Sequence, residues 1–333
     1  MTTEIGVVHY GLGPIGRAIA SLVAERPGVA ARAAVDIDPA VVGRDLAEVI
    51  GRPRPASPRV AASLKDAALD GAVVGVHCAG SSFGAVLPQL LELVERGLHV
   101  VSTCEELSWV DRGSEGARGL DEAARSRGVA VLGTGVNPGF AMDYLPLALS
   151  GVMDHVRSIE VTRVQDAALR RVPLQRKIGA SLSVEQFRAL ADAGQLGHVG
   201  LRESALGLAT ALGWTTAHYE ERLDPVIAQR STPSGLREIQ PGAVLGIHQV
   251  GRLETEDRGH AAVLDLTIAV DAPDAADRVV LRGDPDVVME IPGGLSGDTA
   301  TAAIVVNAIP RLVAASPGLR TMADLPPPHP WGP

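Results

Sequence analysis

The sequence predicts an α/β fold: a doubly wound parallel sheet in the N-terminal part, followed by a second, α+β domain with a mainly antiparallel sheet. Three features of the chain lead to this prediction. Strand-like and helix-like segments alternate through the first 135 residues, a glycine-rich YGLGPIG turn follows the first apolar run, and longer half-buried strands replace the alternation after about residue 145. A chain of 333 residues with 46% hydrophobic content is long enough for two such domains.

In the first part, each apolar run is followed by a segment with helical periodicity. The run Ile5–Tyr10 precedes Pro14–Glu25, in which apolar residues recur at helical spacing from Ile15 to Val23, with a proline in the first turn. Parallel strands are joined by such crossover helices, so the repeated units predict a parallel sheet. The other strands are expected at 31–35, 72–77, 99–102 and 129–132, and the other helices at 83–96 and around 120–127.

The second part alternates apolar and polar residues, as half-buried strands do. Strands are expected at 156–164, 263–270, 279–281 and 287–291, with helix-compatible stretches at 184–193 and 202–212 between them. An apolar helix is expected at 298–316, followed by the proline-rich tail LPPPHPWGP, which should be extended.

The composition excludes several classes of function. A net charge of −9 without a basic run or stripe argues against a nucleic-acid partner. No window of about 18 apolar residues lacks a charge or a helix breaker, and no basic region precedes the first apolar stretch, so we expect a cytoplasmic protein without a membrane span or signal peptide. Cys78 and Cys104 form neither a disulfide framework nor a zinc pattern and are expected to be reduced, buried thiols. No cluster of His, Asp and Glu has ligand spacing, so no metal is expected.

The YGLGPIG turn has the GxGxxG spacing, and it stands between a predicted strand and a predicted helix. Gly11 permits the tight turn, Gly13 lets the backbone approach a pyrophosphate, and Gly16 lets the helix pack closely on the strand. Pro14 and Ile15 open the helix, whose free N–H groups favour phosphate. The context predicts a Rossmann-type dinucleotide site; a structural glycine turn is the alternative.

An acidic residue follows at the expected distance. Asp36 comes twenty residues after Gly16, at the end of the second strand, where it would accept hydrogen bonds from the ribose hydroxyls and repel a 2′-phosphate. This favours NAD, and NADP stays open because Arg44 lies nearby in the sequence.

Two further segments end at the same edge of the predicted sheet. In CAGSSF, the small residues Cys78, Ala79 and Ser81 would let the nicotinamide end of the cofactor pass, although the serines could instead cap the next helix. In VNPGF, Asn137 and Pro138 follow the last strand and are expected to contact the nicotinamide carboxamide; a simple domain-crossing loop is the alternative.

Two adjacent carboxylates, Glu105 and Glu106, follow the strand at 99–102 in the segment TCEEL. In an extended segment neighbouring side chains point to opposite sides, so at most one is expected to face the cofactor. Beside a nicotinamide and among aliphatic side chains, its pKa would be raised and it could exchange protons near neutral pH. Alternatively, the pair caps the following loop or forms surface salt bridges.

Five motifs, in order along the chain, are together typical of one family. They are VSTCEELS (101–108), GTGVNPGFAMD (133–143), RVPLQRKIGAS (171–181), GHVGLRES (197–204) and GLSGDTATAAIVVNAIPRL (294–312). Over nearly its full length the chain resembles the 2,4-diaminopentanoate dehydrogenases and the related native amine dehydrogenases, and its N-terminal part is similar to that of dihydrodipicolinate reductase. It lacks the paired histidines of dihydrodipicolinate reductases, which argues against that activity.

The resemblance implies reversible, NAD(P)H-dependent reductive amination. Ammonia and a small ketone or aldehyde would condense to an iminium in a cleft between the domains, and Glu105, with Glu106 as the fallback, would handle the amine. It also implies a cofactor domain of residues 1–143, to which 297–333 return, and a substrate and dimerisation domain of residues 144–296 in a homodimer. A diaminopentanoate (amino acid) dehydrogenase is the alternative, and a noncatalytic NAD(P)-binding regulatory protein is a further one.

Three residues are candidates for the substrate pocket. Phe140 and Tyr144 belong to the six Phe and Tyr residues of the chain and could be pocket walls or core residues. His198, which follows a glycine, could be a lid contact or a structural histidine. No lysine or arginine cluster is dedicated to an amino-acid carboxylate, which favours a simple carbonyl substrate.

Overall fold

Contacts within the chain divide it into two units. Unit 1 comprises residues 1–140 and 297–333, and unit 2 comprises residues 141–296. The computed structural model describes residues 4–52, 57–168, 170, 172–256 and 259–331. Arg171, the first residue of the third family motif, and the last two residues of the proline-rich tail lie outside these ranges. In the described part of the chain, no helix is long and apolar enough to cross a bilayer.

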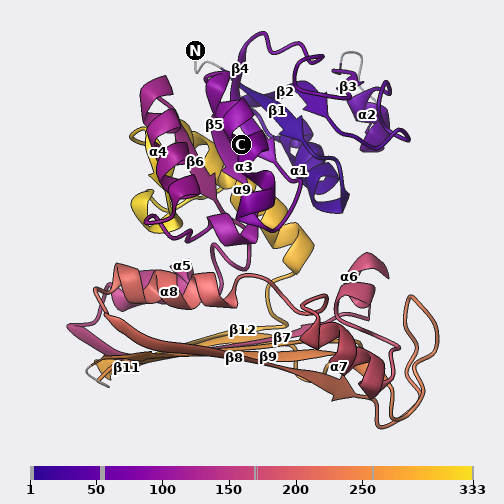
Figure 1. Cartoon of the computed structure of the whole chain (residues 1–333), viewed down its shortest axis with the longest axis vertical. Helices are drawn as coiled ribbons and strands as arrows, with labels where there is room; N and C mark the ends of the chain where they lie inside the picture. Colours follow the sequence, from indigo (N-terminus) through magenta and orange to yellow (C-terminus); the bar gives the residue numbers. More distant parts are fainter. Residues whose placement is uncertain (1–3, 53–56, 169, 171, 257–258, 332–333) are drawn as a thin grey trace. The chain divides into compact units, whose positions relative to one another are not determined.

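Unit 1 is built on the expected parallel sheet. Its seven strands have the order β13-β6-β5-β4-β1-β2-β3, and every strand pair is parallel (Figure 1). The direction of sheet growth reverses between β1 and β4, and such a switch point is where open α/β sheets bind ligands. The strands are β1 (Ile5–Tyr10), β2 (Val29–Val35), β3 (Val60–Ala61), β4 (Ala72–His77), β5 (His99–Ser102), β6 (Ala130–Gly133) and β13 (Gly318–Arg320).

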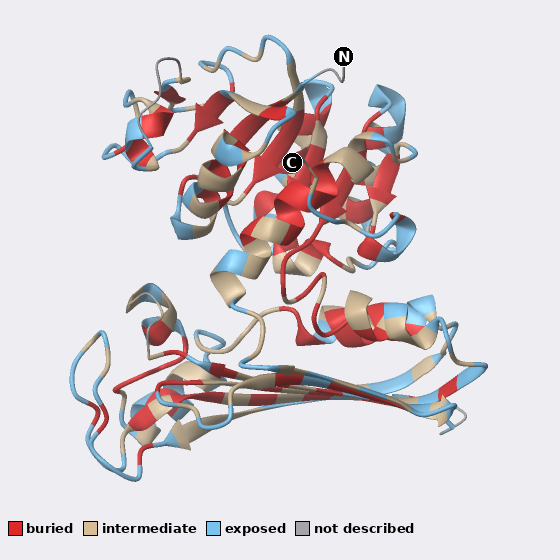
Figure 2. Cartoon of the chain, turned by 180° about the vertical axis from the view of Figure 1, so that it is seen from behind, coloured by how far each residue is buried: buried red, intermediate tan, exposed pale blue. Residues whose placement is uncertain are grey.

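Helices cover both faces of this sheet, and the strands between them are buried (Figure 2). On one face α3 and α4 pack on a core of aliphatic side chains that includes Leu90, Val100 and Leu120, each 0% exposed. On the other, α1 packs against α9, whose contacts reach β4, β5 and β6. The helices are α1 (Pro14–Glu25), α2 (Leu46–Val49), α3 (Phe83–Glu95), α4 (Glu115–Arg127) and α9 (Gly297–Val313), with the 3-10 turns η1 (Glu105–Leu107) and η2 (Met322–Asp324).

Unit 2 contains a six-stranded sheet with the order β12-β11-β7-β10-β9-β8. Its pairs are antiparallel except β7 with β10, which confirms the mainly antiparallel prediction. Strands β8 and β9 were not expected, because β8 is a charged, largely exposed edge strand with a proline and β9 contains two glycines. The strands are β7 (His155–Asp166), β8 (Thr216–Ile227), β9 (Val244–Thr255), β10 (Ala261–Ala269), β11 (Ala276–Asp284) and β12 (Val287–Pro292).

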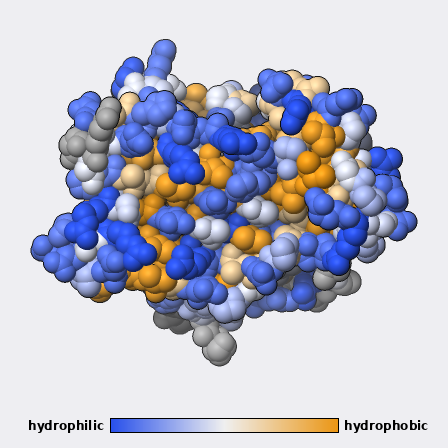
Figure 3. All heavy atoms as spheres, turned by 90° about the horizontal axis from the view of Figure 1, so that it is seen from below, coloured by the Kyte–Doolittle hydropathy of each residue, from blue (hydrophilic) through white to orange (hydrophobic). Residues whose placement is uncertain are grey.

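The two faces of the unit 2 sheet differ in their cover. Helices α5 (Tyr144–Ser150) and α8 (Leu201–Ala211) lie on one side of the strands, while α6 (Val172–Lys177) and α7 (Val184–Asp192) lie towards one end of the sheet (Figure 1). Within the described part of unit 2, we see no helix on the opposite side, which we call the open face. Valines and charged residues of both signs alternate there, and Figure 3 shows apolar patches among polar ones on the side seen from below. The open face includes Glu160, Thr162, Val250, Arg252, Val263, Asp265 and Arg278.

Candidate functional site

The glycine loop between β1 and α1 is shaped by close backbone contacts. Gly11 has φ +91°, and a Cβ there would lie 2.7 Å from the carbonyl oxygen of Cys78. A Cβ on Gly16 would lie 2.0 Å from the carbonyl oxygen of Gly11, so α1 packs directly on the loop. At Gly13, by contrast, a Cβ would meet no atom within 4 Å. With Pro14 in the first turn and no capping side chain, the N-terminus of α1 has the space and the N–H groups that a diphosphate requires.

Asp36 is fixed at the end of β2 by two backbone groups. Its Oδ2 accepts a hydrogen bond from the N–H of Leu12 at 2.5 Å, and its Oδ1 accepts one from the N–H of Asp38 at 2.8 Å. Asp36 therefore ties the glycine loop to the second strand, a role that spacing alone did not reveal. The residue remains partly exposed, so its oxygens retain lone pairs for further donors.

The segment after β4 forms a wall of the glycine loop. The N–H of Cys78 donates to the carbonyl of Tyr10 at 2.7 Å, and the carbonyl of Cys78 and the amide of Ala79 lie against Gly11. Both cysteines are free thiols, as expected, but only Cys104 is buried as a residue. Desolvation raises the pKa of both thiols to about 12, so neither is a thiolate at neutral pH.

Glu105 and Glu106 do not lie in an extended segment, and that prediction is wrong. They form the 3-10 turn η1, in which the N–H of Leu107 donates to the carbonyl of Cys104 at 3.1 Å. The hydroxyl of Ser108 donates to the carbonyl of Glu105 at 2.8 Å and closes the turn. Alternation of side chains along a strand therefore cannot assign roles to the two partly exposed glutamates.

The side chain of Glu106 caps the helix α3. Its Oε2 accepts a hydrogen bond from the N–H of Phe83, the first residue of α3, at 2.6 Å. Ser82, the N-cap residue of that helix, makes no side-chain cap, so Glu106 supplies the cap from another segment. The carbonyl of Ser81 also accepts bonds from the N–H of Glu106 at 3.3 Å and the thiol of Cys104 at 3.1 Å.

A chain of hydrogen bonds between polar side chains, which the sequence did not suggest, leads to the start of this turn. The Nδ1 of His77 is 2.9 Å from the hydroxyl of Ser102, and its Nε2 is 2.8 Å from Oε1 of Gln89. The hydroxyl of Ser102 also accepts the N–H of Cys104 at 3.1 Å. Burial lowers the pKa of His77, which keeps the ring neutral. Together these hydrogen bonds connect Gln89 on α3 with Cys104 at the start of η1.

The loop after β6 is held by the first turns of α9. The N–H of Val136 donates to the hydroxyl of Thr301 at 3.2 Å, and a Cβ on Gly139 would collide with the amide of Gly135. The bond between Asn137 and Pro138 is cis. Phe140, partly exposed, is the last residue of unit 1 before the chain leaves it.

Two of the predicted pocket residues belong to unit 2. Tyr144 opens α5, and its N–H donates to Oδ1 of Asp143 at 2.6 Å, while Oδ2 of Asp143 accepts the hydroxyl of Ser204 at 2.9 Å. Partial burial raises the pKa of Tyr144. The backbone of His198 is clamped by the Gln249 amide, which accepts its N–H at 2.7 Å and donates to its carbonyl at 2.8 Å.

Unit 2 also contains a buried ion pair that sequence reasoning missed. Arg163 on β7 and Asp277 on β11 are each 2% exposed, with Nε and Oδ1 3.4 Å apart. Arg163 donates a hydrogen bond to the carbonyl of Leu295 at 3.1 Å, and Asp277 accepts one from the N–H of Leu295 at 2.8 Å. The ion pair therefore fixes Leu295 through both of its backbone groups. Burial lowers the pKa of Arg163 and raises that of Asp277, because desolvation exceeds their attraction.

The structure thus brings the unit 1 candidates to the carboxyl edge of one sheet. The glycine loop touches Cys78 and Asp36, and the turn with Glu105 and Glu106 touches Ser81. Tyr144 and His198 each have a defined place within unit 2.

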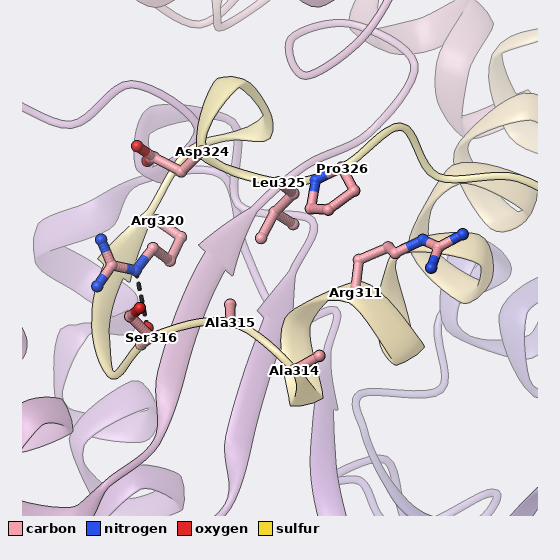
Figure 4. Close-up of a pocket in the computed structure, with 8 residues that line it drawn as sticks. All are labelled: Arg311, Ala314, Ala315, Ser316, Arg320, Asp324, Leu325 and Pro326. Atoms are coloured by element: carbon pink, nitrogen blue, oxygen red, sulfur yellow. Dashed lines mark hydrogen bonds between the residues drawn. The ribbon is translucent and has the colours of Figure 1, made fainter.

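A hollow of about 330 Å³ in unit 1 does not belong to this edge. It is lined by the end of α9 and the segment around β13, including Arg311, Ala315, Arg320 and Asp324 (Figure 4). Gly318 on β13 pairs with Ala130, the first residue of β6, so this hollow lies near the amino ends of the strands, at the edge of the sheet opposite to the glycine loop. The Nε of Arg320 already donates to the carbonyl of Ser316 at 2.8 Å.

Comparison with known proteins identifies relatives of the whole chain. Residues 140–332 match the family model of the 2,4-diaminopentanoate dehydrogenase C-terminal domain. The chain is 29% identical to 2,4-diaminopentanoate dehydrogenase of Acetoanaerobium sticklandii, covering 98% of this chain and 94% of the relative. It is 26% identical to amine dehydrogenase of Streptomyces virginiae, covering 97% and 96%. Its structure is similar to that of amine dehydrogenase from Mycobacterium smegmatis, with a TM-score of 0.86 at 23% identity, covering 98% and 97% of the two chains.

Proposed function

Because the chain belongs to the 2,4-diaminopentanoate dehydrogenase family, whose C-terminal domain it contains, we propose that it is an NAD(P)H-dependent amine dehydrogenase. The reaction is the reversible reductive amination of a small ketone or aldehyde with ammonia. The observation that carries the proposal is the carboxylate turn η1 after β5, at the edge of the sheet where the glycine loop after β1 fits a diphosphate.

The residues around the glycine loop fit a dinucleotide. The open space at Gly13 and the uncapped N-terminus of α1 are assigned to the diphosphate, and Asp36, at the end of β2, is assigned to the ribose hydroxyls. When bound, NAD(P)H supplies the hydride that reduces the iminium carbon. The small residues Cys78, Ala79 and Ser81, with Asn137 and Pro138, border the nicotinamide end.

Glu105 is assigned the proton-handling role. As general base it takes a proton from ammonium, and as general acid it returns this proton to the hydroxyl of the hemiaminal, which leaves as water. The carboxylate that is restored in this way stabilises the iminium cation. The assignment rests on the Glu106 carboxylate being committed to the N-terminus of α3 through the N–H of Phe83. Phe140, Tyr144 and His198 are assigned to the substrate pocket.

The preferred substrate is an uncharged carbonyl compound. A substrate with its own carboxylate needs a cation that is not neutralised, and the charge of the buried Arg163 is balanced by Asp277. A second candidate, 2,4-diaminopentanoate, is favoured by the relative that is 29% identical and by Nη1 of Arg163, which has no hydrogen-bond partner among the described residues.

We assign NAD as the better cofactor and NADP as the weaker one. Asp36 and Asp38 place two carboxylates in the loop after β2, where both repel a 2′-phosphate. The two free thiols fit a cytoplasmic location, where thiols stay reduced.

A homodimer through the open face is part of the proposal. In one row across the sheet, Arg252 and Glu160 flank Val263, so the surface offers both charges and an apolar centre to an identical surface. Val263→Glu should convert the dimer to a monomer in analytical ultracentrifugation. The control Val152→Glu, at a valine that is 74% exposed, should remain dimeric. A monomeric parent would refute the homodimer.

The function is tested by NADH and NADPH oxidation with and without ammonium at alkaline pH. The panel contains uncharged ketones and aldehydes and, as the charged member, 2-amino-4-oxopentanoate. Ammonium-dependent oxidation that is lost in Glu105→Ala supports the proposal, and a preference for the charged compound selects the second candidate. Oxidation that ignores ammonium would identify a carbonyl reductase. NADH binding without turnover on any member would instead favour a regulatory protein.

A further inference from the structure

The contacts of Glu106 assign it a task that differs from that of its neighbour. We propose that Glu106 is a positioning residue, whose carboxylate caps α3 and thereby fixes the turn that presents Glu105. The inference rests on the proposed function, because it concerns how the same turn is held for proton transfer.

The first step is the geometry of the cap. Oε2 of Glu106 lies 2.6 Å from the N–H of Phe83, and this N–H is one of the donors that a helix leaves without an internal partner. A carboxylate at a helix N-terminus gains both a charge-assisted hydrogen bond and attraction to the positive end of the helix dipole. No side-chain cap from Ser82 competes for this position.

The second step is the number of ties between the two segments. The carbonyl of Ser81 accepts the N–H of Glu106 and the thiol of Cys104, so three hydrogen bonds join η1 to the start of α3. In addition, the hydroxyl of Ser102 accepts a hydrogen bond from the N–H of Cys104 and is hydrogen-bonded to His77. Glu105 therefore sits on a turn whose neighbours on both sides are anchored.

The third step is what each substitution removes. Glutamine at position 106 keeps an oxygen that accepts the Phe83 N–H but cannot carry a proton, and alanine removes both properties. At position 105, glutamine removes proton transfer as completely as alanine does. A positioning role therefore predicts rescue by glutamine at position 106 and none at position 105.

The experiment compares Glu106→Gln, Glu106→Ala, Glu105→Gln and the control Ser82→Ala in the full-length protein. We expect kcat of Glu106→Ala to fall about 10²-fold, the loss associated with a displacement of about 1 Å. Glu106→Gln should fall less than tenfold, Glu105→Gln should be inactive, and Ser82→Ala should match the parent. The Kd for NADH should stay within twofold of the parent in all four, because the glycine loop is untouched.

Three outcomes would overturn the inference. If Glu106→Gln is as inactive as Glu105→Gln while its melting temperature equals that of the parent, Glu106 is itself a proton carrier and not a positioning residue. Parental activity in Glu106→Ala would show that the cap is dispensable. If the parent itself has no ammonium-dependent activity, the proposed function fails, but thermal unfolding still tests whether Glu106 caps α3. In that case Glu106→Ala must melt several degrees below Ser82→Ala, and equal melting temperatures refute the cap.

Discussion

Replacing Gly16 with alanine introduces a methyl group where the backbone of the glycine loop already lies. The new Cβ would be 2.0 Å from the carbonyl oxygen and 2.9 Å from the carbonyl carbon of Gly11. Real Cβ atoms essentially never approach other atoms below 3.0 Å, so α1 must move away from the loop by about 1 Å. Overpacking of this kind costs about 3 kcal/mol, at the upper end of the usual range because both obstructing atoms are backbone.

Gly13 provides the matched control, because the same substitution there meets no atom within 4 Å. Gly13→Ala should keep the stability of the parent within about 1 kcal/mol, yet its methyl group occupies the space assigned to the diphosphate. We expect NADH to bind at least tenfold more weakly, a loss of about 1.4 kcal/mol.

Thermal unfolding and fluorescence titration with NADH measure the two effects separately. Gly16→Ala should melt about 6–12 °C below the parent, since each kcal/mol corresponds to about 2–4 °C in a protein of this size. Gly13→Ala should melt within about 2–4 °C of the parent and lose affinity only. A Gly16→Ala protein as stable as the parent, or a Gly13→Ala protein with parental affinity, would refute this account of the loop.

Three further predictions concern buried or fixed charges. Asp277→Ala leaves Arg163 buried without its counter-charge and should destabilise the protein by about 3–5 kcal/mol in urea unfolding. The double variant Asp277→Ala with Arg163→Met should recover most of this loss, because no buried charge is left unpaired. Equal stability of the single and the double variant would contradict the claim that Asp277 compensates the charge of Arg163. His9 is fully buried and its pKa falls from 6.5 to about 4, so the unfolded state binds more protons between these values and stability should fall by about 2 kcal/mol from pH 7 to pH 5. His9→Leu should remove that part of the slope in unfolding curves measured at both pH values, and an unchanged slope would exclude His9 as its source. Asp36→Asn should raise the Kd for NADH and reduce the ratio by which the protein prefers NADH over NADPH. Parental Kd values for both cofactors would show that Asp36 does not face the ribose.

The fold of unit 1 could be predicted because its strands are buried on both faces and read as short apolar runs. Ile5–Tyr10, Ala72–His77 and His99–Ser102 have the expected bounds, and Pro14–Glu25 is the expected helix. Edge strands lack this signal, since their exposed residues have no reason to be apolar. Thr216–Ile227 was missed for that reason.

The candidate site was predictable only as far as residue types and strand ends allow. The glycine spacing identified the loop, but the different tasks that we propose for Glu105 and Glu106 rest on the N-terminus of α3, which approaches the turn only in the folded chain. Arg163 and Asp277 were missed similarly, because each is an ordinary charged residue until β7 and β11 pair and bury both.

The return of the chain to unit 1 has a consequence for how the protein folds as it is synthesised. Residues 141–296 of unit 2 are contiguous, whereas unit 1 lacks α9 until residues 297–313 have left the ribosome. Val305, Val306, Ala308, Ile309 and Leu312 are 0% exposed in the finished structure, so their partners on the first-made strands and α1 stay uncovered in the nascent chain. The usual order, in which N-terminal domains fold first, is therefore reversed: the unit that is begun first is completed last, and its aggregation-prone interval spans the synthesis of the whole of unit 2.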